Sequence, residues 1–151
     1  METQVEEGEL LFHTQSVRNP IDPADRARSA EHLKALIRDH SCIPGELNIV
    51  FCSDEVLQGI HERQLQKSDL TDIITFDHVG AALISGDLFI STERVAENAR
   101  SLERPEAEEL HRVMAHGILH LLGYKDKSPE EKTAMRKAEQ EALQRWGFRS
   151  C

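Results

Sequence analysis

The sequence predicts a single α+β domain, in which a small mixed sheet of about four strands is covered by about five helices, mainly on one face. Segments with strand-like alternation are interrupted by amphipathic helical segments, and three helical segments then follow one another, which is typical of this class. No repeat, low-complexity tract or compositional shift marks a linker, so we expect one domain over residues 1–151. Two histidines four residues apart indicate a metal site on the penultimate helix.

The first half of the chain alternates strands with helices. Residues 1–9 carry four acidic side chains and no basic one, and we expect them to form a loose tail. Residues 10–17 alternate weakly and predict an edge strand. In residues 24–40 apolar side chains recur at spacings of three and four, which predicts an amphipathic helix. Pro44-Gly45 predicts a turn, and the alternation over residues 47–51 predicts a half-buried strand.

The second half begins with a helix expected over residues 54–65, with Ser53 as its N-cap. Residues 71–76 and 82–90 are β-branched and apolar, and they predict two paired strands joined by a short connection. Three helices complete the chain, and we expect them over 92–103 with Thr92 as the cap, over 105–122 beginning at Pro105, and over 128–146 from the Ser128 cap to the Gly147 stop.

Charge and cysteine content limit the compartment and the partners. The formal net charge is −9, so the molecule has no overall basic field, and any contact with nucleic acid must be local. Three cysteines without a C-x-x-C pair fit a reducing compartment, and the acidic N-terminus does not resemble a signal peptide. Residues 113–124 form the longest mainly apolar stretch, which is too short to span a membrane. We therefore expect a cytoplasmic protein without a membrane or DNA partner.

The segment over residues 116–126 carries the chemistry. On a helix, His116 and His120 lie on one face and can present two imidazole nitrogens to one point. Gly123 follows the last apolar residue of the helix, where a left-handed conformation can turn the chain back and bring Asp126 toward the same point. The spacing therefore predicts a three-ligand metal site of two histidines and one carboxylate.

Three such ligands leave one position of a tetrahedral site open, which is the pattern of a catalytic zinc, and a metal-bound water there would be the nucleophile. The spacing of His116, His120, Gly123 and Asp126 also matches the metzincin motif H-E-x-x-H-x-x-G-x-x-H. Gly117 replaces the glutamate that serves those proteases as general base, so a zincin-like hydrolase is disfavoured. The alternative for the histidines is a hydrogen-bonded place in the core.

These residues resemble the YbeY family of bacterial rRNA maturation factors and single-strand endoribonucleases, whose signature is H-G-x-L-H-L-x-G-Y-D-H. The matching positions are His116, Gly117, Leu119, His120, Leu121, Gly123 and Tyr124. Lys125 stands where the family usually has aspartate, and Asp126 stands where it has a third histidine. The resemblance implies a metal set of His116, His120 and Asp126, and we expect the carboxylate to admit other divalent ions beside Zn²⁺.

Two further segments are similar to the family. Residues 71–76 resemble T-D-V-L-S-F, and residues 86–91 resemble G-D-[IL]-x-I-S. The family commonly has a Y-R pair six to seven residues before the threonine, and its arginine is implicated in RNA cleavage. Those positions hold Gln64 and Leu65 here, so the general base is unknown, and Arg63 is a candidate replacement or a solvated helix charge.

The resemblance implies a metal-dependent endoribonuclease that acts on single-stranded RNA, in 16S rRNA 3′-end maturation and ribosome quality control, with the small ribosomal subunit and its proteins as partners. The alternative is a non-catalytic ribosome assembly factor with a structural metal. Residues 125–151 hold seven basic and five acidic side chains, so this region could engage phosphates locally, with Lys125 as a candidate beside the motif. Asp72 and Asp87 are candidates to orient the histidines, or are caps, and the family links the position of Asp87 to a ribosomal protein.

Overall fold

The computed structural model describes residues 6–65, 72–77 and 83–148, and of residues 62–65 it describes the backbone alone. Four strands form one mixed sheet in the order β1 (Leu10–Gln15), β2 (Ile43–Cys52), β4 (Leu83–Ser91) and β3 (Ile73–Asp77). β2 pairs in parallel with both β1 and β4, and β3 pairs antiparallel with β4. The expected mixed sheet and the expected pairing of the two adjacent strands are both confirmed.

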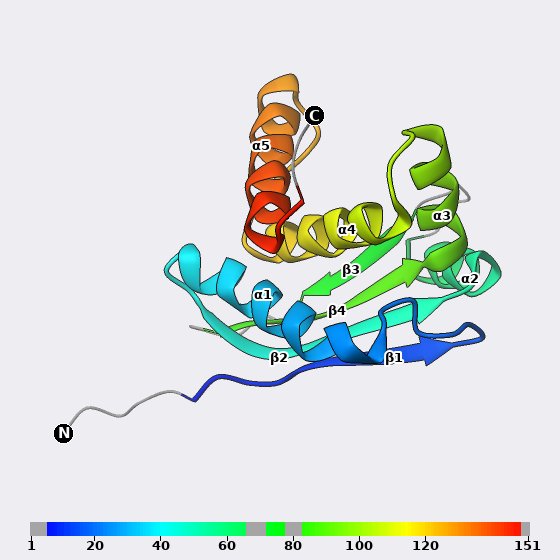
Figure 1. Cartoon of the computed structure of the whole chain (residues 1–151), viewed down its shortest axis with the longest axis horizontal. Helices are drawn as coiled ribbons and strands as arrows, with labels where there is room; N and C mark the ends of the chain where they lie inside the picture. Colours follow the sequence, from blue (N-terminus) through cyan, green and yellow to red (C-terminus); the bar gives the residue numbers. More distant parts are fainter. Residues whose placement is uncertain (1–5, 66–71, 78–82, 149–151) are drawn as a thin grey trace.

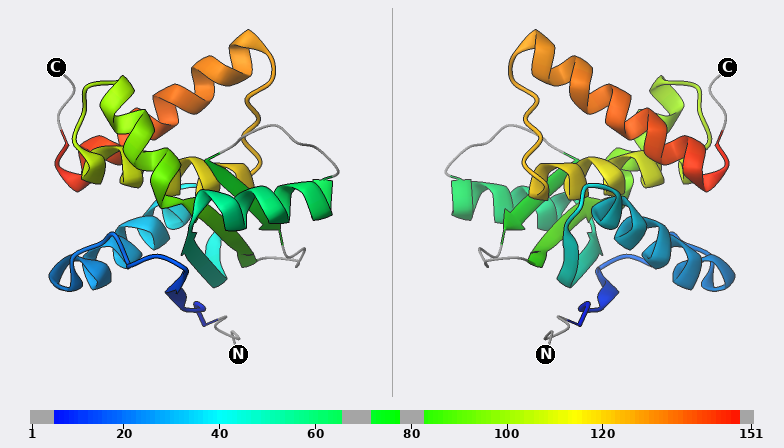
Figure 2. Two further views of the ribbon diagram at one scale, coloured as in Figure 1. Left: turned by 90° about the vertical axis from the view of Figure 1, so that its right-hand side faces the viewer. Right: turned by 90° about the vertical axis from the view of Figure 1, so that its left-hand side faces the viewer.

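The helices form layers on the sheet. They are α1 (Arg26–Asp39), α2 (Asp54–Leu65), α3 (Thr92–Ser101), α4 (Glu106–Leu121) and α5 (Pro129–Trp146), with a short 3₁₀ turn η1 (Pro23–Asp25) before α1. α1 and α4 cover one face of the sheet, and α5 packs on the outer side of α4 (Figures 1 and 2). α2 packs on the opposite face. Within the described chain, no helix is both long and apolar enough to cross a bilayer.

The main core lies between the sheet and α4. Alternate residues of the central strands, among them Phe51 of β2 and Leu88 of β4, point to this side and are fully buried. Gly117 of α4 allows a close approach, because a Cβ there would lie 2.4 Å from Leu88 Cδ2 and 2.7 Å from Ile73 Cδ1. The helix that carries both histidines is therefore fixed against the sheet by close packing.

A smaller core lies under α2 on the other face. Its buried residues are Cys52, Leu57 and Ile74. Cys52 is a free thiol, and burial together with the charge of Asp54 raises its pKa to about 11. This thiol fills space in the core rather than acting as a nucleophile or a ligand.

Pro44-Gly45 does not form the expected turn, because both residues belong to β2. The Pro44 carbonyl accepts a hydrogen bond from the Gly8 amide at 2.9 Å, and the register of β2 against β4 shifts between Pro44 and Leu47. A proline has no amide hydrogen to donate to a ladder, so it is tolerated at such an irregularity. The strand is therefore longer than the alternation of residues 47–51 indicated.

Part of the acidic N-terminal segment is also held by contacts, in contrast to the loose tail expected over residues 1–9. Both carboxylate oxygens of Glu7 accept hydrogen bonds of 2.6 Å from Arg38 of α1. The Glu9 carbonyl accepts from the Leu47 amide at 3.0 Å, which extends the pairing with β2. Residues 1–5 lie outside the described chain.

The expected helix caps are found with one correction. Ser91, and not Thr92, caps α3, because the Ser91 hydroxyl accepts a hydrogen bond from the Arg94 amide at 3.1 Å. Ser53 caps α2 as predicted, and Ser128 forms a capping box with Glu131 at the start of α5. The capping box thus fixes the start of α5 directly after the loop that follows α4.

Candidate metal centre

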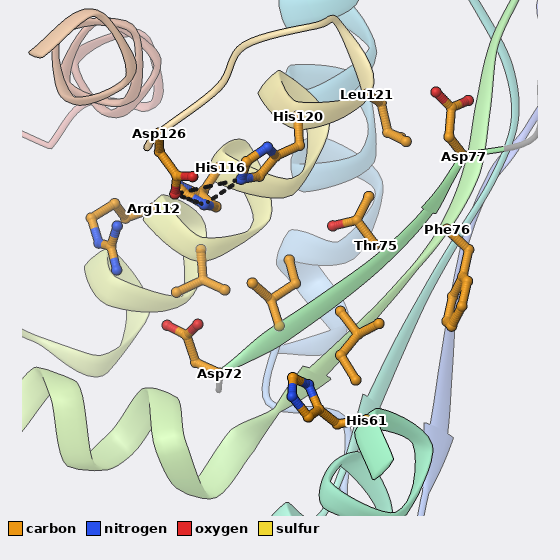
Figure 3. A pocket seen from close by; sticks show the side chains of 13 residues that line it. His61, Asp72, Thr75, Phe76, Asp77, Arg112, His116, His120, Leu121 and Asp126 are labelled. Atoms are coloured by element: carbon orange, nitrogen blue, oxygen red, sulfur yellow. Dashed lines mark hydrogen bonds and ion pairs between the residues drawn. The ribbon is translucent and has the colours of Figure 1, made fainter. Parts of the chain in front are cut away.

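The end of α4 brings three metal-ligand side chains together. His116 and His120 are four residues apart on one face of the helix. Gly123 has φ of +103°, and the Tyr124 amide donates to the Leu119 carbonyl at 3.0 Å, so the chain reverses directly after the helix. This reversal turns Asp126 back toward the two imidazoles (Figure 3).

The three side chains lie at distances that suit one small cation. The two Nε2 atoms of His116 and His120 are 2.9 Å apart. Asp126 Oδ2 lies 3.5 Å from the Nε2 of His116 and 3.7 Å from that of His120. An ion about 2.1 Å from each of three tetrahedral ligands would hold those ligands roughly 3.4 Å apart. The observed distances bracket this value, so the cluster could hold a metal ion.

The hydrogen bonds of the outer ring nitrogens set the imidazole tautomers. His116 Nδ1 lies 2.6 Å from Glu139 Oε2, and His120 Nδ1 lies 3.1 Å from the Tyr124 carbonyl oxygen. Both partners are acceptors, so in each ring Nδ1 is the nitrogen that carries the hydrogen. The two Nε2 atoms and the Asp126 carboxylate then face one point, where a hydrogen bond between the Nε2 atoms, 2.9 Å apart, or a cation bound between all three side chains would relieve the repulsion of their lone pairs.

Glu139 belongs to a buried ion network behind His116. Its side chain is 7% exposed, and Oε1 accepts a hydrogen bond of 3.1 Å from Arg112 Nη1. Arg112 also donates to both oxygens of Glu109, at 2.9 and 2.7 Å. Burial by itself would raise the pKa of Glu139, but the hydrogen bond to His116 and the charge of Arg112 lower it below its usual value. Glu139 is therefore an ionised partner for the His116 N–H group.

Sequence reasoning missed Glu139, although its position carries a signal. The buried side chains of α5 near it are apolar, including Met135, Ala138 and Ala142, and Glu139 shares their face. A carboxylate on a buried helix face requires a partner, and the histidine motif on the preceding helix offers one.

The two aspartates proposed to orient the histidines have other partners. Asp72 accepts a hydrogen bond from Asn98 Nδ2 at 3.1 Å, and Asp87 accepts from Asn48 Nδ2 at 3.1 Å. The register places Asp87 beside Asn48 and Phe76, and the next residue of the strand, Leu88, points to the main core. Its side chain therefore points to the sheet face opposite α4, away from the histidines.

A cleft of about 670 Å³ opens beside the three side chains, between α4 and β3 (Figure 3). Its lining includes His116, His120 and Asp126 at one end, and His61 of α2 with Asp72 at the other. His61 is buried, and among the described residues neither of its ring nitrogens has a hydrogen-bond partner. The sequence analysis did not select His61, because a single histidine in a helix carries no motif.

Comparison with known proteins decides the family. The profile described as "Endoribonuclease YbeY" matches residues 13–147. The chain belongs to the YbeY family. A relative named "Endoribonuclease YbeY" from Phocaeicola vulgatus is 50% identical over 134 residues, which cover 89% of this chain and 96% of the relative. Another of the same name, from Bacteroides fragilis, is 40% identical over 134 residues, with coverage of 89% and 95%.

A solved structure supports the fold of this YbeY chain. The solution structure of TM1509 from Thermotoga maritima matches with a TM-score of 0.60 at 21% identity, and the match covers 90% of this chain and 91% of that one. The predicted family membership and fold class are thus confirmed. At this identity the structural likeness concerns the fold alone.

Of the remaining candidates from the YbeY resemblance, only Lys125 has a described side chain. The Lys125 side chain is exposed and does not line the cleft. Arg63, Gln64 and Leu65 belong to α2, and their side chains lie outside the described part of the structure, as does the start of the segment over residues 71–76. Arg112 is the only lysine or arginine among the described residues that line the cleft.

Proposed function

We propose that this chain is a metal-dependent endoribonuclease that cleaves single-stranded RNA in 16S rRNA 3′-end maturation and ribosome quality control, in the cytoplasm. The supporting observation is the convergence of the His116 Nε2, His120 Nε2 and Asp126 Oδ2 atoms at the edge of an open cleft. The name shared by the relatives, "Endoribonuclease YbeY", supports RNA cleavage as the reaction.

We assign His116, His120 and Asp126 as the ligands of one divalent ion, and Zn²⁺ as that ion. Two imidazoles and a carboxylate are typical of catalytic zinc, and the carboxylate also allows harder ions such as Mn²⁺. When bound, the ion supplies Lewis acidity toward a phosphoryl oxygen of the substrate.

The chain's own residues orient the ligands and hold the RNA. Glu139 and the Tyr124 carbonyl accept the Nδ1 hydrogens, so both Nε2 atoms are kept facing the ligand position. Arg112 fixes the Glu139 carboxylate, and the wall formed by β3 gives the cleft an extended edge on which a single strand can lie.

Two other functions make different predictions. A zincin-like hydrolase needs a glutamate at position 117, where even a Cβ atom would overlap Leu88. A ribosome assembly factor that binds without cleaving is favoured by Leu65, which replaces the arginine of the family motif. In both the catalytic and the binding case, the small ribosomal subunit and its proteins are the partners we propose, and neither DNA nor a membrane is one.

The test is cleavage of a single-stranded RNA that copies the 3′ end of precursor 16S rRNA. Metal-loaded parent chain is compared with His120→Ala, and with His13→Ala as a control that removes an exposed histidine of β1. We expect cleavage by the parent and the control but not by His120→Ala. Equal cleavage by all three would reveal a contaminating nuclease and contradict the proposal. No cleavage by any of them would favour the assembly factor.

The ligand assignment is tested separately by elemental analysis. We expect Asp126→Ala to lose most of its bound metal after dialysis, because two imidazoles alone hold an ion weakly. Full metal stoichiometry in Asp126→Ala would show that Asp126 is not a ligand.

A further inference from the structure

A second hollow meets the cleft at the candidate metal centre. It has a volume of about 220 Å³ and lies between α4 and α5. Arg112, His116 and Asp126 line both hollows, so the two adjoin at the ligand cluster. The α5 side of this second hollow adds Lys132 and Arg136.

The positive charges near the cluster are distributed unevenly. The main cleft has Asp72 and Asp77 in its lining, and Arg112 is its only lysine or arginine among the described residues. The Arg112 charge is already balanced by Glu109 and Glu139. In the described part of the cleft, no unpaired cation is therefore left for a phosphate.

Lys132 and Arg136 provide the unpaired charge on the other side. They are four residues apart on α5, so they lie one above the other on the same helix face. Both side chains are exposed, and neither has an ion pair or side-chain hydrogen bond with a described residue. Like charges at this spacing repel each other, and an anion bound between them would remove that repulsion.

The carboxylates in the second hollow do not cancel these two charges. Glu139 is engaged by His116 and Arg112, as described above. Asp126 points toward the two imidazoles. The hollow therefore presents a pair of cations to solvent directly beside the point where a scissile phosphate would lie.

We infer that Lys132 and Arg136 bind backbone phosphates of the RNA strand on one side of the scissile bond, so that the strand passes from the main cleft across the metal centre into the hollow beside α5. This inference rests on the proposed function and assigns the direction in which the substrate leaves the site. Phosphate contacts of this kind position a nucleic acid without reading its sequence. They also explain how a chain with a net charge of −9 can hold a polyanion.

The test is the salt dependence of RNA binding. Anisotropy of a short fluorescent single-stranded RNA is measured with metal-loaded chain at several salt concentrations, and a gel verifies that the RNA is intact. The test variant is Lys132→Ala with Arg136→Ala. The matched control is Arg18→Ala with Lys137→Ala, which removes two exposed cations that line neither hollow.

For single strands each lost phosphate contact lowers the salt slope by about 0.7, so we expect the test variant to lose about 1.4 in slope and to bind at least roughly fivefold more weakly at 0.1 M salt. The control should keep the parent's slope. A variant with both charges exchanged, Lys132→Arg with Arg136→Lys, should regain it. The urea midpoint and metal content should be the same in all chains, because every substituted side chain is exposed.

The outcomes separate this inference from the proposed function. An unchanged slope in the test variant overturns the phosphate site, even if the parent cleaves RNA. If the parent binds RNA but does not cleave it, a reduced slope in the test variant supports the phosphate site, while the nuclease proposal fails. An equal loss of salt slope in the control and the test variant would show a general effect of net charge, and this outcome also overturns the inference.

Discussion

The Nδ1 atom of His116 lies 2.6 Å from Oε2 of Glu139, a carboxylate that is almost fully buried on the next helix. This contact joins α4 to α5, and Arg112 of α4 reaches the other oxygen of the same carboxylate. Because Glu139 can only accept, it fixes the imidazole with its Nε2 lone pair toward Asp126. The arrangement prepares His116 as a ligand before any ion is bound.

Replacing Glu139 is therefore expected to weaken metal binding. Glu139→Gln keeps the shape of the side chain but removes the negative charge that contacts His116 and Arg112. Loss of such a partner typically lowers metal affinity by about 10- to 100-fold, and we expect a decrease of about that size here. Competition with a chromophoric chelator measures it. Glu141→Gln, an exposed change on the same helix, is the control. Equal affinity in the two variants would show that the Glu139 contact does not orient the ligand.

The chain reversal at Gly123 should matter for the same site. Gly123 and Gly147 have φ of +103° and +101°, and a Cβ at either position would meet nothing within 4 Å. Alanine at either position should therefore introduce the same backbone strain and lower the free energy of unfolding by roughly 1–2 kcal/mol. Only Gly123 lies between the histidines and Asp126 in the chain.

We accordingly expect Gly123→Ala and Gly147→Ala to lower the urea midpoint by similar amounts, while only Gly123→Ala weakens metal binding. Both quantities can be measured on the same preparations. If metal affinity falls equally in the two variants, the reversal at Gly123 has no specific part in placing Asp126.

These glycines show what local sequence could predict. Several features that the structure has as expected depend on residues within a few positions of one another. They are the left-handed Gly123 after α4, the stop of α5 at Gly147, the caps at Ser53 and Ser128, and the histidine pair. Such signals are local because helix ends and i, i+4 pairs satisfy their hydrogen bonds within one or two turns.

Features that depend on distant residues were missed. Glu139 is 23 residues from His116 in sequence, and only the packing of α5 on α4 brings the two together. Pro44 is part of a strand because residues near Gly8 pair with it, which overrides its preference for a turn. The cap of α3 was displaced by one residue because Ser91 and Thr92 are both suitable, and the choice depends on where β4 ends.

Gly117 gives a stability prediction. In the sequence, Gly117 marked the absence of a protease's glutamate and a match to the YbeY signature. The structure gives a physical reason for the glycine, since α4 lies too close to Leu88 and Ile73 for a side chain. Gly117→Ala should gain about 1 kcal/mol of helix propensity but lose about 1–3 kcal/mol to overpacking. We expect a net loss, seen as a lower urea midpoint. A higher midpoint would mean that the flexible ends of Leu88 and Ile73 move aside at little cost.

The last prediction concerns pH and lies away from the metal centre. His111 of α4 contacts Ser29 of α1, with 3.1 Å between its Nε2 and the serine hydroxyl, and its Nδ1 lies 2.6 Å from the Ala107 carbonyl oxygen. Burial lowers the pKa of His111 more than the hydrogen bond to Ala107 raises it. Burial and the charge of Arg28 likewise lower the pKa of His32.

Because both pKa values are lower in the folded chain than in the unfolded one, the unfolded chain takes up protons first as the pH falls. The stabilisation that these two neutral imidazoles give to the fold is thus complete above the ordinary histidine pKa of about 6.5. It is lost progressively as the pH falls through that value toward the lower pKa values of the folded chain. We expect the urea midpoint to decrease between about pH 7.5 and 5.5, and to decrease less in His111→Gln than in the parent. His13→Gln, at an exposed position of β1, should follow the parent. If His111→Gln loses as much stability on acidification as the parent does, burial of the neutral imidazole is not what makes the fold sensitive to acid.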